Sequence, residues 1–184
     1  MLGMEVNIIK KSLIISVVCI VVIAIGCIVY LNKISSTKVI NVKKEAVSIV
    51  LNDPSSAKPT LIFIKGKIYR PLFKDHYFEG SIVIDGYDFT QNPLNRMYIV
   101  DRKQGINRGM LGYHMKQKPY DTTNLGVIFY DDDFKNINIT WKTTPEEFSS
   151  NLYIVTANSY DQAIEVQNQM RQKIKDDNWF EPHK

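Results

Sequence analysis

Cysteine is nearly absent from this chain, and its absence limits the chemistry available. Of the 184 residues only Cys19 and Cys27 are cysteines, and both lie in an apolar run near the start. Residues 28–184 therefore hold no disulfide framework, no thiol nucleophile and no cysteine-based zinc site. A cysteine-free domain suits either side of a membrane, with a slight preference for the outside, where stray thiols oxidise.

An excess of one charge and the common catalytic motifs are also lacking. The chain has 23 Lys and Arg against 19 Asp and Glu, and its basic residues are scattered singly. This balance is not typical of nucleic-acid-binding proteins, so we expect no nucleic-acid partner. There is no Gly-x-Ser-x-Gly, no P-loop, no Gly-x-Gly-x-x-Gly and no His-Glu-x-x-His. We therefore expect no catalytic residue, no cofactor and no metal ligand, and an enzyme is the less favoured class.

Ser12 to Leu31 reads SLIISVVCIVVIAIGCIVYL, a run without a single charge, after a tail of residues 1–11. About 20 residues in a helix rise roughly 30 Å, which matches the hydrocarbon core of a bilayer. Lys11 and Lys33 flank the run, and Tyr30 occupies a position typical of an interfacial aromatic residue. The sequence predicts a transmembrane helix over residues 12–31, with membrane lipid as its partner.

Cys27 leaves a second interpretation of this run open. Ala24-Ile25-Gly26-Cys27 resembles a loose bacterial lipobox, which would make the chain a lipoprotein lipidated at Cys27. However, Ile28 to Leu31 continue the apolar run, whereas a mature lipoprotein normally begins with small or polar residues. We favour the uncleaved anchor because it accounts for all of the apolar residues.

The orientation of the helix follows from its flanks. Counting lysines alone would place the C-terminal side in the cytoplasm, but long domains are translocated largely regardless of charge. A tail of about 11 residues that ends in Lys10-Lys11 is typical of a signal anchor. We expect a bacterial single-pass protein of the cell membrane, with its C-terminal domain outside.

Residues 32–45 are polar and rich in lysine, and we expect them to form a tether before a domain over residues 46–184. From Thr60 onward, β-branched and aromatic residues alternate with polar ones between turn signals, as in an antiparallel meander. Lys65-Gly66 is predicted to be a hairpin turn, because glycine accepts positive φ readily. Further hairpins are predicted around residues 101–105 and 131–135. Along Asn136 to Trp141 the alternation predicts one buried face and one wet face.

The C-terminal part changes period. Leu152 to Val155 is a short apolar strand, and Ser159 with Gln162 forms a capping box for a helix over residues 160–175. A stripe of Ile164, Val166 and Met170 would cover the sheet. The fold class is therefore α+β: an N-terminal transmembrane helix, then an antiparallel sheet of about seven strands with one C-terminal amphipathic helix.

Several polar groups are candidates for chemistry, although each has a plainer interpretation. His76 lies between Asp75 and Glu79 and could serve a metal or acid–base site, but a polar turn is favoured; His183 lies near the end of the chain. Asp131-Asp132-Asp133 could attract Ca²⁺, but consecutive carboxylates diverge, so a solvated turn is favoured. A hydrolase would need Glu79, Asp85, Asp88 and His114 in one cleft.

Tyrosine is abundant, with ten residues. Tyr69, Tyr77, Tyr87, Tyr98, Tyr113 and Tyr120 are spread along the β region. Tyrosine suits a binding face and is also a good strand former. We expect a non-enzymatic domain at the outer face of the cytoplasmic membrane that contacts a protein or a cell-envelope component. A membrane-tethered hydrolase using dispersed carboxylates, and a lipoprotein carrying the same domain, remain alternatives.

Overall fold

The structure, a computed structural model, describes residues 2–34, 37–71, 74–115, 118–141 and 152–174. It divides into two compact units, one around the N-terminal helix and one containing the strands. Helix α1 (Leu2–Ile34) contains Leu13–Leu31, a segment long and apolar enough to cross a membrane, and the side chains of this segment are exposed. Apolar side chains on all sides are what a helix surrounded by lipid requires.

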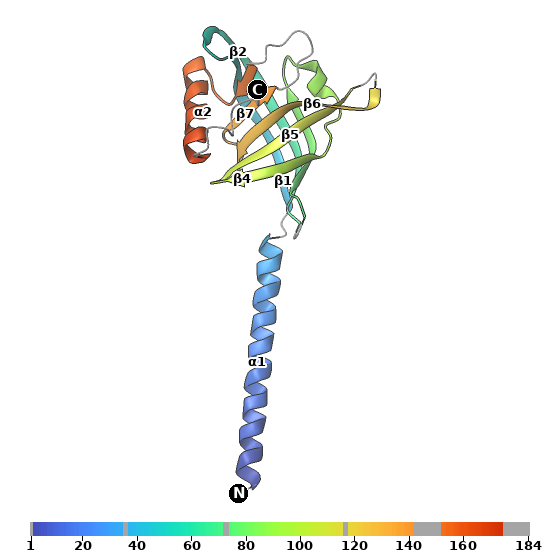
Figure 1. The fold of residues 1–184 in the computed structure, drawn as a ribbon, viewed down its shortest axis with the longest axis vertical. Helices are drawn as coiled ribbons and strands as arrows, with labels where there is room; N and C mark the ends of the chain where they lie inside the picture. Colours follow the sequence, from blue (N-terminus) through green and yellow to red (C-terminus); the bar gives the residue numbers. More distant parts are fainter. Residues whose placement is uncertain (1, 35–36, 72–73, 116–117, 142–151, 175–184) are drawn as a thin grey trace. The chain divides into compact units, whose positions relative to one another are not determined.

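The β-rich unit is a closed barrel in which each strand pairs antiparallel with the next, as Figure 1 shows. Pairing of Val47 with Val155 joins the first strand to the last and closes the barrel. The predicted antiparallel fold class is confirmed, and the described residues contain one strand more than expected. The strands are β1 (Thr37–Val50), β2 (Asp53–Tyr69), β3 (Tyr77–Ile84), β4 (Met97–Lys103), β5 (Ile106–Met115), β6 (Lys118–Asp131), β7 (Ile137–Trp141) and β8 (Leu152–Val155).

The additional strand lies where the sequence indicated a tether. Residues 37–45 form the first part of β1 and pair with β2 from Thr37 onward, so they are not a tether. Ile40 and Ala46 face the core, while Lys43 between them points outward. The period-two pattern was hidden because Lys38 and Lys44 share the face of Ile40 and Ala46, whereas apolar Val39 lies on the outer face.

The predicted turn at Lys65-Gly66 is wrong, because β2 continues through both residues. Gly66 pairs with Ile40 on one side and with Gly80 on the other. A Cβ atom at Gly66 would lie 2.3 Å from the carbonyl oxygen of Glu79 and 2.7 Å from the ring of Phe78. The two glycines make room for this ring inside the barrel, so Gly66 marks a close approach.

The predicted hairpins around residues 101–105 and 131–135 are confirmed. Gln104 and Gly105 make the first turn, both with positive φ (47° and 81°), which is the geometry that suits a two-residue hairpin. Asp131 begins the second turn and is bonded to Lys135 and Asn136. Sequence signals for tight turns depend on neighbouring residues, which explains why these two hairpins could be predicted from the sequence.

Side chains fill the barrel interior. Ile62, Ile64, Ile82 and Ile128 are almost fully buried there, and so are larger residues such as Tyr130. A barrel of about eight strands is just wide enough to be filled in this way. The interior is therefore a packed core.

Helix α2 (Tyr160–Ile174) lies against the outside of the barrel (Figure 1). The cap at Ser159 is confirmed, because the backbone amide of Gln162 donates to Ser159 Oγ (3.3 Å). The return bond of the capping box differs: Gln162 Oε1 accepts from the backbone amide of Asn158 (3.0 Å), one residue before the expected Ser159. Met170 is buried in the contact with the barrel, as predicted, whereas Ile164 and Val166 are half-buried at its edge.

The outer face of β7 differs from the prediction. All five residues of this strand are buried, including Asn138 and Thr140, which were expected to face water. Gln167 of α2 donates from Nε2 to Asn138 Oδ1 (3.2 Å), so a polar pair lies beneath the helix. The polar side chain of Asn138 therefore contacts the polar side chain of Gln167 and not solvent.

Candidate functional site

The carboxylates considered for a hydrolase lie at different places on the barrel. Glu79 is near the start of β3, where Arg96 bonds it, while Asp85 follows the end of that strand. Six residues of extended chain span about 20 Å, whereas paired catalytic carboxylates of glycosidases stand roughly 5–9.5 Å apart. Asp88 is close to Asp85 in sequence, but it is exposed and accepts from Gln91 Nε2 (3.4 Å).

The histidines do not complete such a site among the described residues. His76 accepts a backbone bond from Ile99 (2.8 Å), and His114 donates its amide to Pro93 (2.9 Å), so each belongs to a different strand region. No three His, Cys, Asp or Glu side chains gather closely enough to hold a metal in the part of the chain that the structure describes. His183 lies outside that part.

Asp131-Asp132-Asp133 are engaged by the protein itself. Asp131 accepts from the backbone amides of Lys135 (2.7 Å) and Asn136 (3.1 Å), which fixes the turn. Asp132 is paired with Arg102, and Asp133 with Lys38 at 3.0 Å. The three carboxylates diverge, as predicted, but they form structural contacts where a purely solvated turn was expected.

A hollow of about 370 Å³ opens on the barrel surface. It is lined by β1, β2 and the turns after β3 and β8, and its polar side chains include Glu45, Thr60, Asp85 and Asn158. Glu45, Asp85 and Asn158 are exposed, and Thr60 is bonded to the Asp85 backbone (2.8 Å). The carboxylates of this hollow are exposed to solvent, so it carries no catalytic assignment.

Two of the tyrosines singled out in the sequence belong to the core. Tyr113 is fully buried and its hydroxyl donates to the Ile82 carbonyl (2.8 Å); burial raises its pKa far above the usual value. Tyr87 shares a hydrogen bond with Ser48 (2.8 Å), and burial raises its pKa as well. Tyr87 and Phe89 pack against Trp141. These rings are part of the packed core. The side chain of Tyr120 lies outside the described residues.

Three other tyrosines form a row across the outer surface. Register pairs Tyr69 of β2 with Tyr77 of β3, and Tyr77 with Tyr98 of β4. The rings of Tyr69 and Tyr77 are stacked 4.8 Å apart, and Tyr98 follows at 6.4 Å. The guanidinium of Arg96 lies 4.4 Å from the centre of the Tyr77 ring. We call Tyr69, Tyr77, Arg96 and Tyr98 the tyrosine patch.

Electrostatics hold the cation of the patch in place. Arg96 Nε donates to Glu79 Oε1 (2.8 Å), and this bond raises the pKa of the guanidinium, which therefore stays charged. A charged Arg over an aromatic face is a stabilising cation–π arrangement. Tyr98 remains half exposed, so the patch presents amphipathic rings and one fixed cation to its surroundings.

No protein-family model, curated protein or solved structure matches this chain. The functional interpretation therefore rests on the residues themselves. Sequence reasoning singled out the three tyrosines but missed Arg96. The signal that could have found it is its position two residues before Tyr98, on the same face of an extended chain.

Proposed function

We propose that this chain is a single-pass membrane protein whose barrel is held at the outer face of the cytoplasmic membrane. The barrel works by surface contact with a protein or cell-envelope component and not by catalysis. The observation that carries the proposal is the contrast between a filled barrel interior and the tyrosine patch on its outer surface, where Tyr98 and Arg96 are exposed. Aromatic residues and Arg are enriched at contact surfaces because they combine large area with directed polar groups.

The apolar helix supports the membrane part of the proposal. Leu13–Leu31 has no charged residue, and its exposed Ile, Val and Leu side chains would be costly in water. Ile28 to Leu31 complete the helix, which favours an intact anchor over lipidation at Cys27.

Extraction of isolated membranes tests the anchor. The full chain should stay in the membrane at alkaline pH, and its intact mass should include residues 1–26. Ile23→Arg places a charge at the middle of the span and should weaken retention, since Arg at a helix centre costs about 2.5–3.5 kcal/mol. Ser16→Ala is the matched control and should change nothing.

The lipoprotein alternative makes the opposite prediction about Cys27. If the anchor is an uncleaved helix, Cys27→Ala leaves size and retention unchanged and labelled fatty acid does not enter the protein. A wild-type chain about 26 residues short that incorporates palmitate, with both effects lost in Cys27→Ala, would replace the helix by a lipid anchor.

A further inference from the structure

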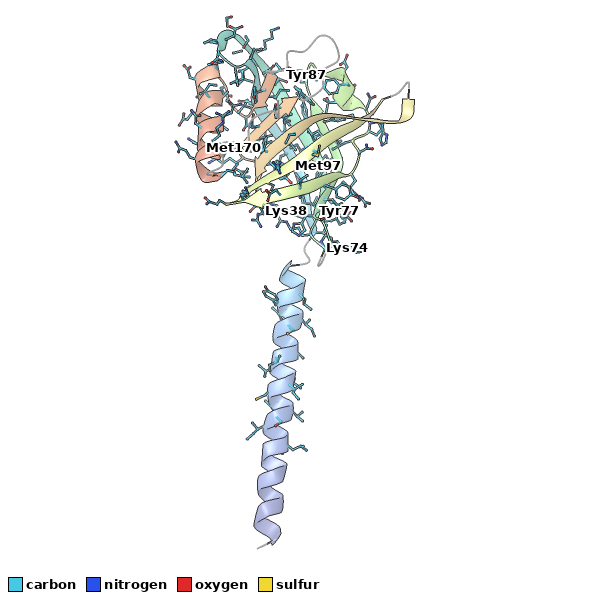
Figure 2. All side chains as sticks on the ribbon, in the orientation of Figure 1. Lys38, Lys74, Tyr77, Tyr87, Met97 and Met170 are labelled. Atoms are coloured by element: carbon cyan, nitrogen blue, oxygen red, sulfur yellow. The ribbon has the colours of Figure 1, made fainter. Side chains whose placement is uncertain are left out.

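The tyrosine patch lies at the end of the barrel where β1 begins. Thr37, the first residue of β1, pairs with Tyr69, the last residue of β2, and Tyr69 pairs with Tyr77. In Figure 2, Lys38 and Tyr77 lie toward one end of the barrel and Tyr87 toward the other. The patch therefore belongs to the end through which the chain enters the barrel.

The length of chain before β1 limits how far this end can be from a membrane that α1 crosses. Three helical residues follow Leu31 and rise about 4.5 Å, and the three peptide steps from Ile34 to Thr37 add at most about 11 Å. The headgroup layer takes up roughly 5–7 Å on each side of the hydrocarbon core. At full extension about 9–10 Å would remain between the headgroup layer and the start of β1, so this end of the barrel stays close to the headgroups.

The exposed side chains beside the patch suit the headgroup layer. Tyrosine is enriched in this layer because its ring is apolar while its hydroxyl can remain hydrogen-bonded to water. Val39 on β1 and Val100 on β4 are 70% and 53% exposed, and the strands that carry the patch, β2 and β3, lie between β1 and β4. Contact with lipid would remove these apolar groups from water.

Three of the cations at this end are paired with carboxylates, while exposed Lys67 lies between Val39 and Glu79. Arg96 is paired with Glu79, Lys38 with Asp133, and Arg102 with Asp132. Because these three cations are paired, the patch would contact lipid mainly through its aromatic and apolar groups. The chemistry fits the surface of a zwitterionic phospholipid layer.

We propose that the tyrosine patch rests in the phospholipid headgroup layer of the membrane that α1 crosses. The inference depends on the proposed function, because it needs α1 to be a membrane span. It names the envelope component that the patch contacts as the membrane surface itself. The end of the barrel carrying Tyr87 then faces away from the membrane.

Spin-label accessibility in vesicles tests the proposal. The full chain, with Cys19→Ala and Cys27→Ala, is reconstituted in phosphatidylcholine vesicles and labelled at Val100→Cys, or at Ser55→Cys as an exposed control near the start of β2. We expect accessibility to a water-soluble nickel relaxation agent to be several-fold lower at position 100, and accessibility to oxygen to be higher. Equal accessibility at both positions, in protein that floats with the vesicles, would overturn the headgroup contact while the anchor stands.

A second variant separates the patch from the short connection. Replacing Tyr69, Tyr77 and Tyr98 together by Ser should raise nickel accessibility at position 100 to the level of position 55. Near-ultraviolet circular dichroism of Trp141 packing checks that the variant folds. Unchanged low accessibility in the folded variant would overturn the role of the patch. Low nickel accessibility that requires anionic lipid, or that is lost in 0.5 M salt, would overturn the claim that aromatic and apolar contact dominates. Protein that fails to float with the vesicles would refute the anchor itself.

Discussion

Gly66→Ala should destabilise the barrel although it adds a single methyl group. The added Cβ would lie 2.3 Å from the Glu79 carbonyl oxygen, 2.7 Å from the Phe78 ring and 2.8 Å from the Gly80 Cα. Two of these neighbours are backbone atoms of a paired strand, and Phe78 is fully buried, so none of the three is free to move aside. Overpacking a filled core costs typically 1–3 kcal/mol, and the backbone contacts place this substitution at the upper end.

Thermal unfolding of the full chain in detergent, followed by near-ultraviolet circular dichroism, measures the effect. A loss of about 2–3 kcal/mol lowers the midpoint of a chain this size by roughly 4–12 °C. Ser81→Ala is the control, because Ser81 is exposed beside Gly80 and its replacement should stay within about 0.5 kcal/mol. A midpoint for Gly66→Ala equal to that of the parent would refute the close approach of β2 and β3.

Three further perturbations test other parts of the fold. The hydroxyl of Tyr113 keeps its proton in the folded chain at a pH where the unfolded chain, with the usual pKa near 10, releases it. The free energy of unfolding should therefore be complete below pH 10 and fall above it. In Tyr113→Phe this fall, measured by urea titration, should be less steep. Met170→Asp should cost about 3–5 kcal/mol in thermal unfolding by burying an unpaired charge, whereas exposed Gln169→Asp should not. Asp131→Ala removes the bonds that fix its turn and should cost roughly 2 kcal/mol, against under about 1 kcal/mol for exposed Asp133→Ala; equal losses would contradict that assignment.

Local signals in the sequence were sufficient for several elements. The uncharged run ending at Leu31, the cap at Ser159 and the turns at Gly105 and Asp131 each depend on residues close together in the chain. Such patterns indicate helix, cap or turn without knowledge of the rest of the fold.

Long-range relations could not be read in the same way. Closure of the barrel pairs Val47 with Val155, and nothing near either residue indicates the other. Gly66 was misread because a glycine required by a turn and one required by a close approach look alike in sequence. Asn138 was misread because burial under α2 replaced water by Gln167.

The candidate site was predictable only in part. Tyr69, Tyr77 and Tyr98 were identifiable as amphipathic residues in strands, but Tyr87 and Tyr113 had the same sequence signature and are buried. Register decides the difference, because it sets which side of each strand faces the core. Arg96 joins the patch through cross-strand contacts with Glu79 and Tyr77, which no single segment reveals.

Labelling of single cysteines in intact cells tests the central claim most directly. In a Cys19→Ala, Cys27→Ala background, Ser55→Cys on the exposed start of β2 should react with a membrane-impermeant maleimide without permeabilisation. Asn7→Cys, in the N-terminal tail, should react only after permeabilisation. The opposite pattern would place the barrel in the cytoplasm and contradict a domain held at the outer face of the membrane.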